Sequence, residues 1–180
     1  NIPDIQRIRF LTSHPNDMSN KIIEAVSALD RVCEHINLPF QAGDDEVLSR
    51  MRRGYTRDQY LRLIDKIRET IPNVSLATDV IVGFCGETEQ QFERTLDLLK
   101  SVEFNKVHSA AYSTRKGTIA DRKFEDNLSL NEKKDRLRAL DNLQKEIQTK
   151  INSNLLGKTT EVLVEGIKNG KMFGRDRNDK

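Results

Sequence analysis

The stretch Thr78-Asp79-Val80-Ile81-Val82-Gly83-Phe84-Cys85-Gly86-Glu87-Thr88 decides the fold of this chain of 180 residues. It contains the most continuous apolar run, Val80 to Val82, which is typical of a parallel strand buried on both faces. Two glycines three residues apart follow, and Thr88 with Gln91 has the spacing of a capping box at the start of a helix. The stretch therefore predicts a strand, a tight turn and a helix, the repeating unit of an α/β fold.

Short β-rich runs alternate with helical patterns on both sides of this stretch. Apolar residues at helical spacing predict helices within 18–29, around 60–67 and around 92–99, and apolar runs predict strands at 5–11, 36–40, 74–84 and 107–112. Two further capping boxes, Thr56 with Gln59 and Ser129 with Glu132, predict helix starts, and the second opens a long amphipathic helix. The alternation predicts right-handed βαβ units and a parallel sheet.

The number of predicted strands limits the architecture. A closed eight-stranded barrel needs roughly 200–250 residues. Residues 1–156 are therefore predicted to form a partial (β/α) barrel or an open α/β sheet. After residue 156 the pattern changes. Residues 160–164 are β-branched and alternating, 168–171 form a turn and 172–173 begin a return strand, which predicts that 157–180 start a small β-rich domain. The chain opens on Asn1 and stops inside this hairpin, so we expect both ends to be cuts in a longer protein.

Composition narrows the possible functions. The net charge is only +2, so any contact with nucleic acid is expected to come from local basic patches. Cys33 and Cys85 lack CxxC spacing, which argues against a disulfide framework and favours a reducing cytoplasm. No apolar run approaches the roughly 18–20 residues that cross a bilayer. The three histidines have no zinc-site spacing.

Three loops are candidates for ligand binding, because ligands of parallel α/β folds bind at the carboxyl ends of the strands. The turn 83–87 lets backbone approach a ligand at a helix N-terminus, although the same spacing also fits a structural turn. Gln41 offers a donor and an acceptor after the preceding strand, where Asp44 is expected to cap a helix. Tyr112 suits stacking on a base, while Arg115 and Lys116 suit phosphate or form a solvated basic loop.

A run of basic residues between positions 50 and 68 is usually a solvated helix face. It would also attract phosphate without sequence specificity. Its members are Arg50, Arg52, Arg53, Arg57, Arg62, Lys66 and Arg68.

Six stretches in order along the chain resemble the tRNA methylthiotransferase family, the MiaB-type radical S-adenosylmethionine enzymes. They are Arg7 to Pro15, Leu38 to Gly43, Met51 to Arg57, Thr78 to Thr88, Tyr112 to Ala120 and Val162 to Gly166. Cys85 and Ala42 depart from the family pattern, where proline and serine are common, and Thr114 and Ile119 replace residues that are often proline.

The resemblance implies a radical S-adenosylmethionine (β/α) barrel over 1–156 and the start of an RNA-binding TRAM module over 157–180. It implies S-adenosylmethionine contacts that are carried over by position, and it makes tRNA the expected partner of the basic and aromatic candidates. The cofactor residues are Gln41, Asp79, Gly83, Gly86 and Glu87, and the tRNA residues are Tyr112, Arg115, Lys116 and Arg175.

The resemblance also implies two 4Fe–4S clusters, one of them on a CxxxCxxC loop that would precede Asn1. The two cysteines of this chain cannot supply such a site, so we expect no metal ligand and no catalytic residue to be assignable here. The 180 residues alone are expected to be inactive as a radical initiator. The implied product is a 2-methylthio group on N6-isopentenyladenosine beside the anticodon, made by a cytoplasmic, monomeric enzyme. Action on threonylcarbamoyladenosine and a non-catalytic tRNA-binding scaffold are the alternatives.

Overall fold

The computed structural model describes residues 4–11 and 14–180, so residues 1–3 and 12–13 of the predicted domain 1–156 lie outside the description. The described elements in chain order are η1 (Pro15–Asp17), α1 (Asn20–Ala28), β1 (His35–Asn37), α2 (Asp45–Arg50), α3 (Arg57–Thr70), β2 (Ser75–Val82), α4 (Glu89–Val102), β3 (Lys106–Ala111), α5 (Ile119–Lys123), α6 (Leu130–Ser153), β4 (Leu163–Lys168) and β5 (Lys171–Arg175). Strands and helices alternate up to α6, which confirms the predicted α/β class.

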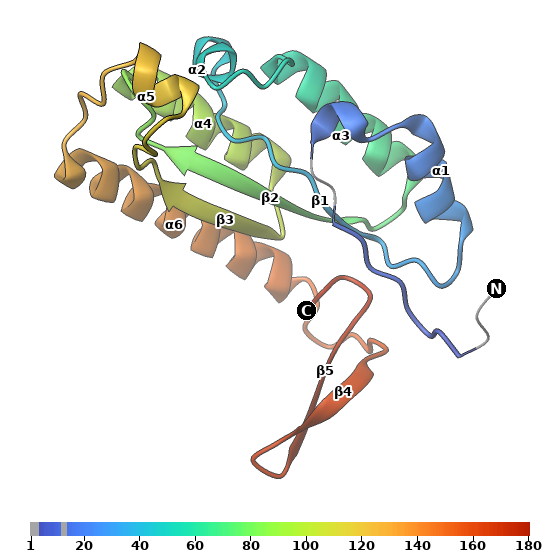
Figure 1. Ribbon diagram of the computed structural model, residues 1–180. Helices are drawn as coiled ribbons and strands as arrows, with labels where there is room; N and C mark the ends of the chain where they lie inside the picture. The colour runs from blue at the N-terminus through green and yellow to red at the C-terminus, as the bar shows by residue number, and fades with distance from the viewer. Residues whose placement is uncertain (1–3, 12–13) are drawn as a thin grey trace.

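The sheet consists of three parallel strands in the order β1-β2-β3, with β2 in the centre (Figure 1). On one face of β2, Leu76, Val80 and Val82 are at most 1% exposed, whereas Asp79 and Ile81 on the other face are half-buried. Alternate residues of a strand point to opposite faces. One face of the sheet therefore carries the hydrophobic core, and the other stays accessible near the carboxyl ends of the strands.

Helices pack on the buried face of the sheet and complete the hydrophobic core. Contacts join α1 to α3 and α4 to α6, and α6 also lies against β2 and β3. All three predicted capping boxes are confirmed, at the starts of α3, α4 and α6. Asp44 caps α2 as expected, because its carboxylate accepts from the N–H groups of Glu46 and Val47. No helix within residues 4–11 and 14–180 is long and apolar enough to span a membrane.

The strand predicted at 36–40 is shorter than expected, because β1 ends at Asn37. The Leu38 N–H still donates to the Ala77 carbonyl at 2.8 Å, but the regular ladder does not continue to Phe40. The side chain of Thr78 takes over locally: its hydroxyl donates to the Leu38 carbonyl at 2.9 Å and accepts from the Phe40 N–H at 3.1 Å. The chain then rejoins the sheet through a single parallel bridge between Gln41 and Val80.

The strand predicted at 5–11 is also wrong in extent. Only Ile8 pairs, in a parallel bridge with Val32, through bonds of 2.7 Å to the Arg31 carbonyl and 2.9 Å from the Cys33 N–H. The apolar side chain of Leu11 is 88% exposed and packs on no sheet. The short apolar run is typical of a strand, but no neighbouring strand pairs with the rest of this segment among the described residues.

The hairpin of β4 and β5 projects away from the sheet at the end opposite the carboxyl ends of the strands (Figure 1). Asn169 and Gly170 have φ of +52° and +74°, as expected of a type I′ turn that joins two twisted strands. Beyond β5, Arg177 returns to the sheet and forms an ion pair with Glu34 at 2.6 Å. The predicted boundary at 156–157 falls between α6 and β4, and its assignment to two domains stays a prediction.

Candidate cofactor-binding site

The turn after β2 is built around two glycines with left-handed backbone. Gly83 and Gly86 have φ of +71° and +68°. A Cβ atom at position 83 would lie 2.5 Å from Cγ of Lys133, and one at position 86 would lie 2.8 Å from Nη1 of Arg50. Gly83 is therefore required both for its backbone conformation and for the close approach of α6.

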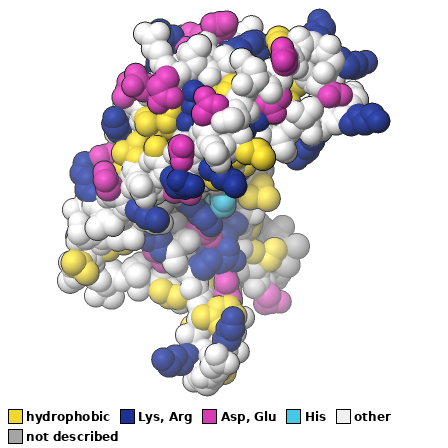
Figure 2. All heavy atoms as spheres, turned by 90° about the vertical axis from the view of Figure 1, so that its left-hand side faces the viewer, with side chains coloured by type: hydrophobic (Ala, Val, Ile, Leu, Met, Phe, Trp, Pro, Cys, Tyr) yellow, Lys and Arg dark blue, Asp and Glu magenta, His cyan; other side chains and the backbone are white. Residues whose placement is uncertain are grey.

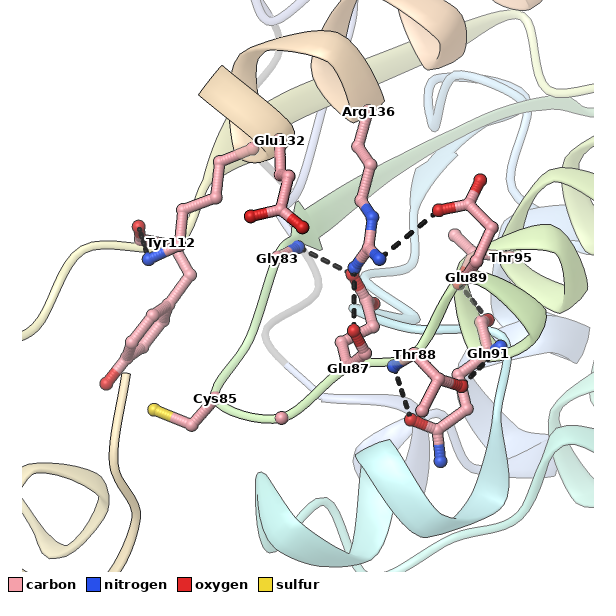
Figure 3. A network of polar contacts seen from close by, with 12 residues as sticks. Gly83, Cys85, Glu87, Thr88, Glu89, Gln91, Thr95, Tyr112, Glu132 and Arg136 are labelled. Carbon is pink, nitrogen blue, oxygen red and sulfur yellow. Dashed lines mark hydrogen bonds and ion pairs between the residues drawn. The ribbon is translucent and has the colours of Figure 1, made fainter. Parts of the chain in front are cut away.

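The carboxylate of Glu87 closes this turn from inside. Its side chain is 1% exposed; Oε2 accepts from the Gly83 N–H at 2.6 Å and from Nη1 of Arg136 at 2.8 Å (Figure 3). Burial raises the pKa of Glu87, while the Gly83 N–H and the Arg136 guanidinium act in the opposite direction. The Gly86 N–H also has a partner, Oδ1 of Asn127 at 2.8 Å. The polar groups of the turn are thus bonded either within the turn or to side chains of neighbouring segments.

A cavity of about 470 Å³ opens at the carboxyl edge of the sheet, beside this turn. Ile81, Phe84 and Tyr112 form an apolar and aromatic wall. The polar wall consists of Gln41, Arg50, Arg52 and Arg53. Ligand sites in proteins have this composition, mostly apolar with a few placed polar groups.

The basic wall of the cavity lacks counter-charges. Arg50 donates to the Cys85 carbonyl at 2.6 Å and to Oε1 of Gln91 at 3.0 Å, and Arg53 donates to the Tyr55 hydroxyl at 3.4 Å. Across the described part of the chain, no carboxylate lies within 4.0 Å of the guanidinium nitrogens of Arg50, Arg52 or Arg53.

Two of these guanidinium groups carry a buried donor without an acceptor among the described residues, namely Nε of Arg50 and Nη2 of Arg53. Such a donor costs about 1–3 kcal/mol unless something accepts from it. The wall therefore fits an anionic group such as a carboxylate or a phosphate. The sequence marked the basic run 50–68, but nothing in it singled out Arg53.

Gln41 and Asp79 lie side by side, since the Gln41 N–H donates to the Asp79 carbonyl at 3.0 Å. Gln41 has a φ of +68°, which turns the chain at this point, and its side chain lines the cavity. The carboxylate of Asp79 instead accepts from Nδ2 of Asn37 at 3.1 Å. Of the five predicted cofactor contacts, Gln41 is the one that lines this cavity, and the roles of all five stay predictions.

The predicted tRNA contacts fall in two places. Tyr112 forms part of the cavity wall, and Arg115 lines an adjoining cavity of about 370 Å³ that also includes Tyr112. Lys116 is exposed beside them. Arg175 is on β5, away from the carboxyl edge, and its contacts with Glu165 and Asp179 raise its pKa.

Surface charge is mixed rather than concentrated on the predicted RNA-contacting side. In Figure 2, basic and acidic side chains intermingle over the upper part of the molecule, and Lys and Arg side chains gather at mid-height above the hairpin. This distribution agrees with the small net charge of +2. Contact with RNA would depend on particular basic side chains rather than on a general excess of positive charge.

The residues of this chain do not fit an iron–sulfur cluster. Cys33 and Cys85 are both buried, and the described residues contain no group of three or more His, Cys, Asp or Glu placed to hold a metal. Clusters of this kind are held by several cysteine thiolates. The described residues therefore supply no ligand set for such a cluster.

Comparison with known protein families identifies the class of protein to which this fold and cavity belong. The model of the Radical SAM superfamily matches residues 2–99, more than half of the chain. The chain belongs to this superfamily, which confirms that part of the predicted resemblance.

Particular relatives carry the comparison further. The chain is 51% identical to the tRNA-2-methylthio-N(6)-dimethylallyladenosine synthase of Herpetosiphon aurantiacus, with 99% of the chain and 41% of the relative aligned. Its identity to the synthases of the same name is 48% in Acetivibrio thermocellus and 46% in Clostridium botulinum. The chain spans 38–41% of the length of these relatives. The predicted similarity to MiaB-type enzymes is confirmed at this level.

Proposed function

We propose that this chain belongs to a radical S-adenosylmethionine tRNA methylthiotransferase that adds a 2-methylthio group to N6-isopentenyladenosine beside the anticodon. The names of the relatives support the substrate class, since each names a dimethylallyladenosine in tRNA. The observation that carries the proposal is the cavity at the carboxyl edge of the sheet, with its aromatic wall and the buried, unpartnered Nη2 of Arg53.

The chemistry of this cavity suits S-adenosylmethionine. Tyr112 and Phe84 offer aromatic surface to an adenine ring, and Gln41 offers both a donor and an acceptor to the ribose or amino group. Nη2 of Arg53 would donate to the carboxylate of the methionine part, with Arg50 and Arg52 adding positive charge. Its volume of about 470 Å³ lies within the usual range for small-molecule sites.

The bound cofactor would supply the methyl group and the radical chemistry that is characteristic of the superfamily. The residues of this chain would bind and orient it, and the apolar wall of Ile81, Phe84 and Tyr112 would exclude water from its reacting end. We propose that the ligands of the 4Fe–4S clusters lie outside these 180 residues, because the chain has only two cysteines and both are buried.

For tRNA we propose contacts by Tyr112, Arg115 and Lys116 at the carboxyl edge and by Arg175 on the hairpin. Residues 157–180 would begin a TRAM module, and the whole enzyme would be a cytoplasmic monomer. The exposed apolar side chains of the hairpin support an incomplete small domain, since Val164, Ile167, Met172 and Phe173 are each at least 50% exposed.

Two other functions follow from the same residues. The loop from Tyr112 to Thr118 also suits an enzyme that acts on threonylcarbamoyladenosine. A non-catalytic tRNA-binding scaffold would need only the basic loop and the hairpin. Incubation of the full-length reconstituted enzyme with tRNA of each kind, followed by mass spectrometry of the nucleosides, separates the three. A 2-methylthio product on isopentenyladenosine alone supports the proposal. The absence of a 2-methylthio product on both tRNAs supports the scaffold.

Calorimetric titration of the full-length protein with S-adenosylmethionine tests the cavity assignment. We expect Arg53→Gln to weaken binding about tenfold, as for the loss of a charged hydrogen bond. Arg62→Gln is the matched control, because Arg62 is exposed on α3. Equal affinity of Arg53→Gln and wild type would contradict the assignment.

The 180 residues themselves allow a separate test of the cluster proposal. After anaerobic incubation of this polypeptide with iron and sulfide, we expect no stoichiometric 4Fe–4S absorbance. A stoichiometric cluster would contradict the placement of its ligands outside these residues.

A further inference from the structure

A buried lysine connects the ends of the two strands that form the cavity wall. The side chain of Lys133, in the first turn of α6, is 3% exposed. Its Nζ donates to both carboxylate oxygens of Asp126, at 2.5 and 2.6 Å, and to the Tyr112 carbonyl at 3.4 Å. Burying an ammonium group is costly unless its charge is paired. Asp126 therefore holds Nζ in one position.

This ammonium group also faces an aromatic ring. Nζ of Lys133 lies 5.3 Å from the centroid of the Tyr112 ring. The Tyr112 ring meets Phe84 edge-on, with 4.9 Å between the centroids, and both rings line the cavity. Attraction between a cation and a ring depends on the face of the ring pointing at the charge. Lys133 thus favours one orientation of the Tyr112 ring.

The alkyl part of Lys133 fixes the other strand end. Its Cγ occupies the space above Gly83, at the end of β2, where a Cβ atom would lie 2.5 Å away. The two strand ends are also joined directly, since the Tyr112 N–H donates to the Val82 carbonyl at 2.8 Å. One side chain of α6 therefore packs against the residues that follow both β2 and β3.

Asp126 extends this network into the loop after β3. Its Oδ2 accepts from the hydroxyl of Thr114 at 3.1 Å, two residues beyond Tyr112. Lys133 itself is not among the residues that line the cavity. Any effect it has on a ligand there must pass through the residues that it holds, above all Tyr112.

We propose that Lys133 is a positioning residue for S-adenosylmethionine, which acts through Tyr112 by holding the aromatic wall of the cavity in its binding arrangement before the cofactor enters. This inference rests on the proposed function, since it takes the cavity to be the cofactor site. A wall that is already ordered lowers the entropy cost of binding. Loss of the charge of Lys133 would release the ring and weaken binding without removing any direct contact.

The test is a double-mutant cycle on the full-length protein, with S-adenosylmethionine affinity measured by calorimetry. We expect Lys133→Met, which keeps the alkyl packing over Gly83, to weaken binding about tenfold. Lys133→Arg, which keeps the charge, should stay within about threefold of wild type. In a Tyr112→Leu background, Lys133→Met should cause little further loss, because its effect passes through the ring.

Lys134→Met is the matched control, because Lys134 is exposed at the next position of the same helix. Its affinity should equal that of wild type. If Lys133→Met does not fold by circular dichroism, Lys133→Gln replaces it in the cycle with the same expectations. Unchanged affinity in Lys133→Met, or an equal loss with and without the Tyr112 ring, would overturn the inference alone. Absence of cofactor binding by the wild-type protein would instead overturn the proposed function.

Discussion

The guanidinium of Arg136 donates to the buried carboxylate of Glu87 at 2.8 Å and to the Glu87 carbonyl at 2.9 Å. It also reaches Glu89, at 3.3 Å, and lies over the ring of Phe92, 5.4 Å from its centroid. A single arginine of α6 therefore holds the turn after β2 and the first residues of α4. The turn that decides the fold is completed by a helix that begins more than forty residues later in the chain.

Loss of Arg136 should destabilise the protein strongly. We expect Arg136→Met to lower the free energy of unfolding by about 3 kcal/mol, because the Glu87 carboxylate would stay buried without its charge partner. Urea unfolding followed by circular dichroism measures this. Arg138→Met is the control, because Arg138 pairs with Asp135 at the surface with 73% of its side chain exposed. An equal effect of the two substitutions would show that the buried pair contributes little.

A methyl group at Gly83 should be far more costly than one at Gly157. Both glycines have positive φ, +71° and +76°, but only Gly83 has a neighbour in the path of a Cβ atom. We expect Gly157→Ala to cost about 1 kcal/mol of stability from backbone strain alone. Gly83→Ala should cost at least about 2 kcal/mol more, since it displaces Lys133. Thermal unfolding compares them, and similar melting temperatures would contradict the close packing of α6.

Gly83 and Gly86 also allow a test on the cofactor. We expect Gly83→Val and Gly86→Val to weaken S-adenosylmethionine binding in the full-length protein. The first would displace Lys133, and the second would displace Arg50 from the cavity wall. Calorimetric titration is the measurement, with folding checked by circular dichroism. If both variants bind S-adenosylmethionine with wild-type affinity, the turn is not part of the cofactor site.

The ion pair of Glu34 and Arg177 should make stability depend on pH. The Arg177 guanidinium lowers the pKa of Glu34 below its ordinary value of 4.5. A carboxyl whose pKa is lower in the folded state contributes stability above its unfolded pKa and loses it as the pH falls through the folded pKa.

We therefore expect Glu34→Gln to lower the melting temperature by about 2 °C at pH 7, a small effect because the pair is partly exposed. As the pH falls below 4.5, the difference from wild type should shrink toward zero. Differential scanning calorimetry across pH 3–7 measures this, with Glu146→Gln on the exposed face of α6 as control. If the difference in melting temperature between Glu34→Gln and wild type grows at acid pH, the prediction for this ion pair is contradicted.

The basic loop after β3 should contribute phosphate contacts. We expect the double variant Arg115→Gln and Lys116→Gln to bind tRNA more weakly, with the slope of log affinity against log salt reduced by about two. Filter binding over a range of salt concentrations measures both quantities. The double variant Lys134→Gln and Arg138→Gln removes the same charge from α6 and should leave the slope unchanged. Equal slopes in both variants would place the RNA contacts elsewhere.

Some of the fold was predictable because its signals are local. The Thr88 and Gln91 pair marks the start of α4 within four residues, and the Asn169-Gly170 turn marks the hairpin. The apolar run of Val80 to Val82 marks the central strand. In each case the residues that interact are neighbours in sequence, so the local sequence is enough to predict the structure.

The failures have equally specific causes. β1 ends early because the Thr78 hydroxyl, from another strand, bonds to the Leu38 carbonyl and the Phe40 N–H in place of backbone partners. The segment 5–11 is a short β-rich run, but it pairs only at Ile8. In both cases the outcome depended on which segment lies alongside, and residue pattern does not specify that.

Local residue patterns were sufficient to predict the α/β class, the central strand with its glycine turn, the capped helices and the likeness to the methylthiotransferases. Tertiary structure alone decided which side chains meet at the carboxyl edge. Lys133 and Arg136 are ordinary basic residues in a charged helix until α6 packs on β2 and β3, and Arg53 is one of several arginines until its Nη2 is buried. The reason is physical: burial and pairing of a charge depend on partners brought from distant parts of the chain, and these decide whether a charged side chain is solvated, structural or available to a ligand.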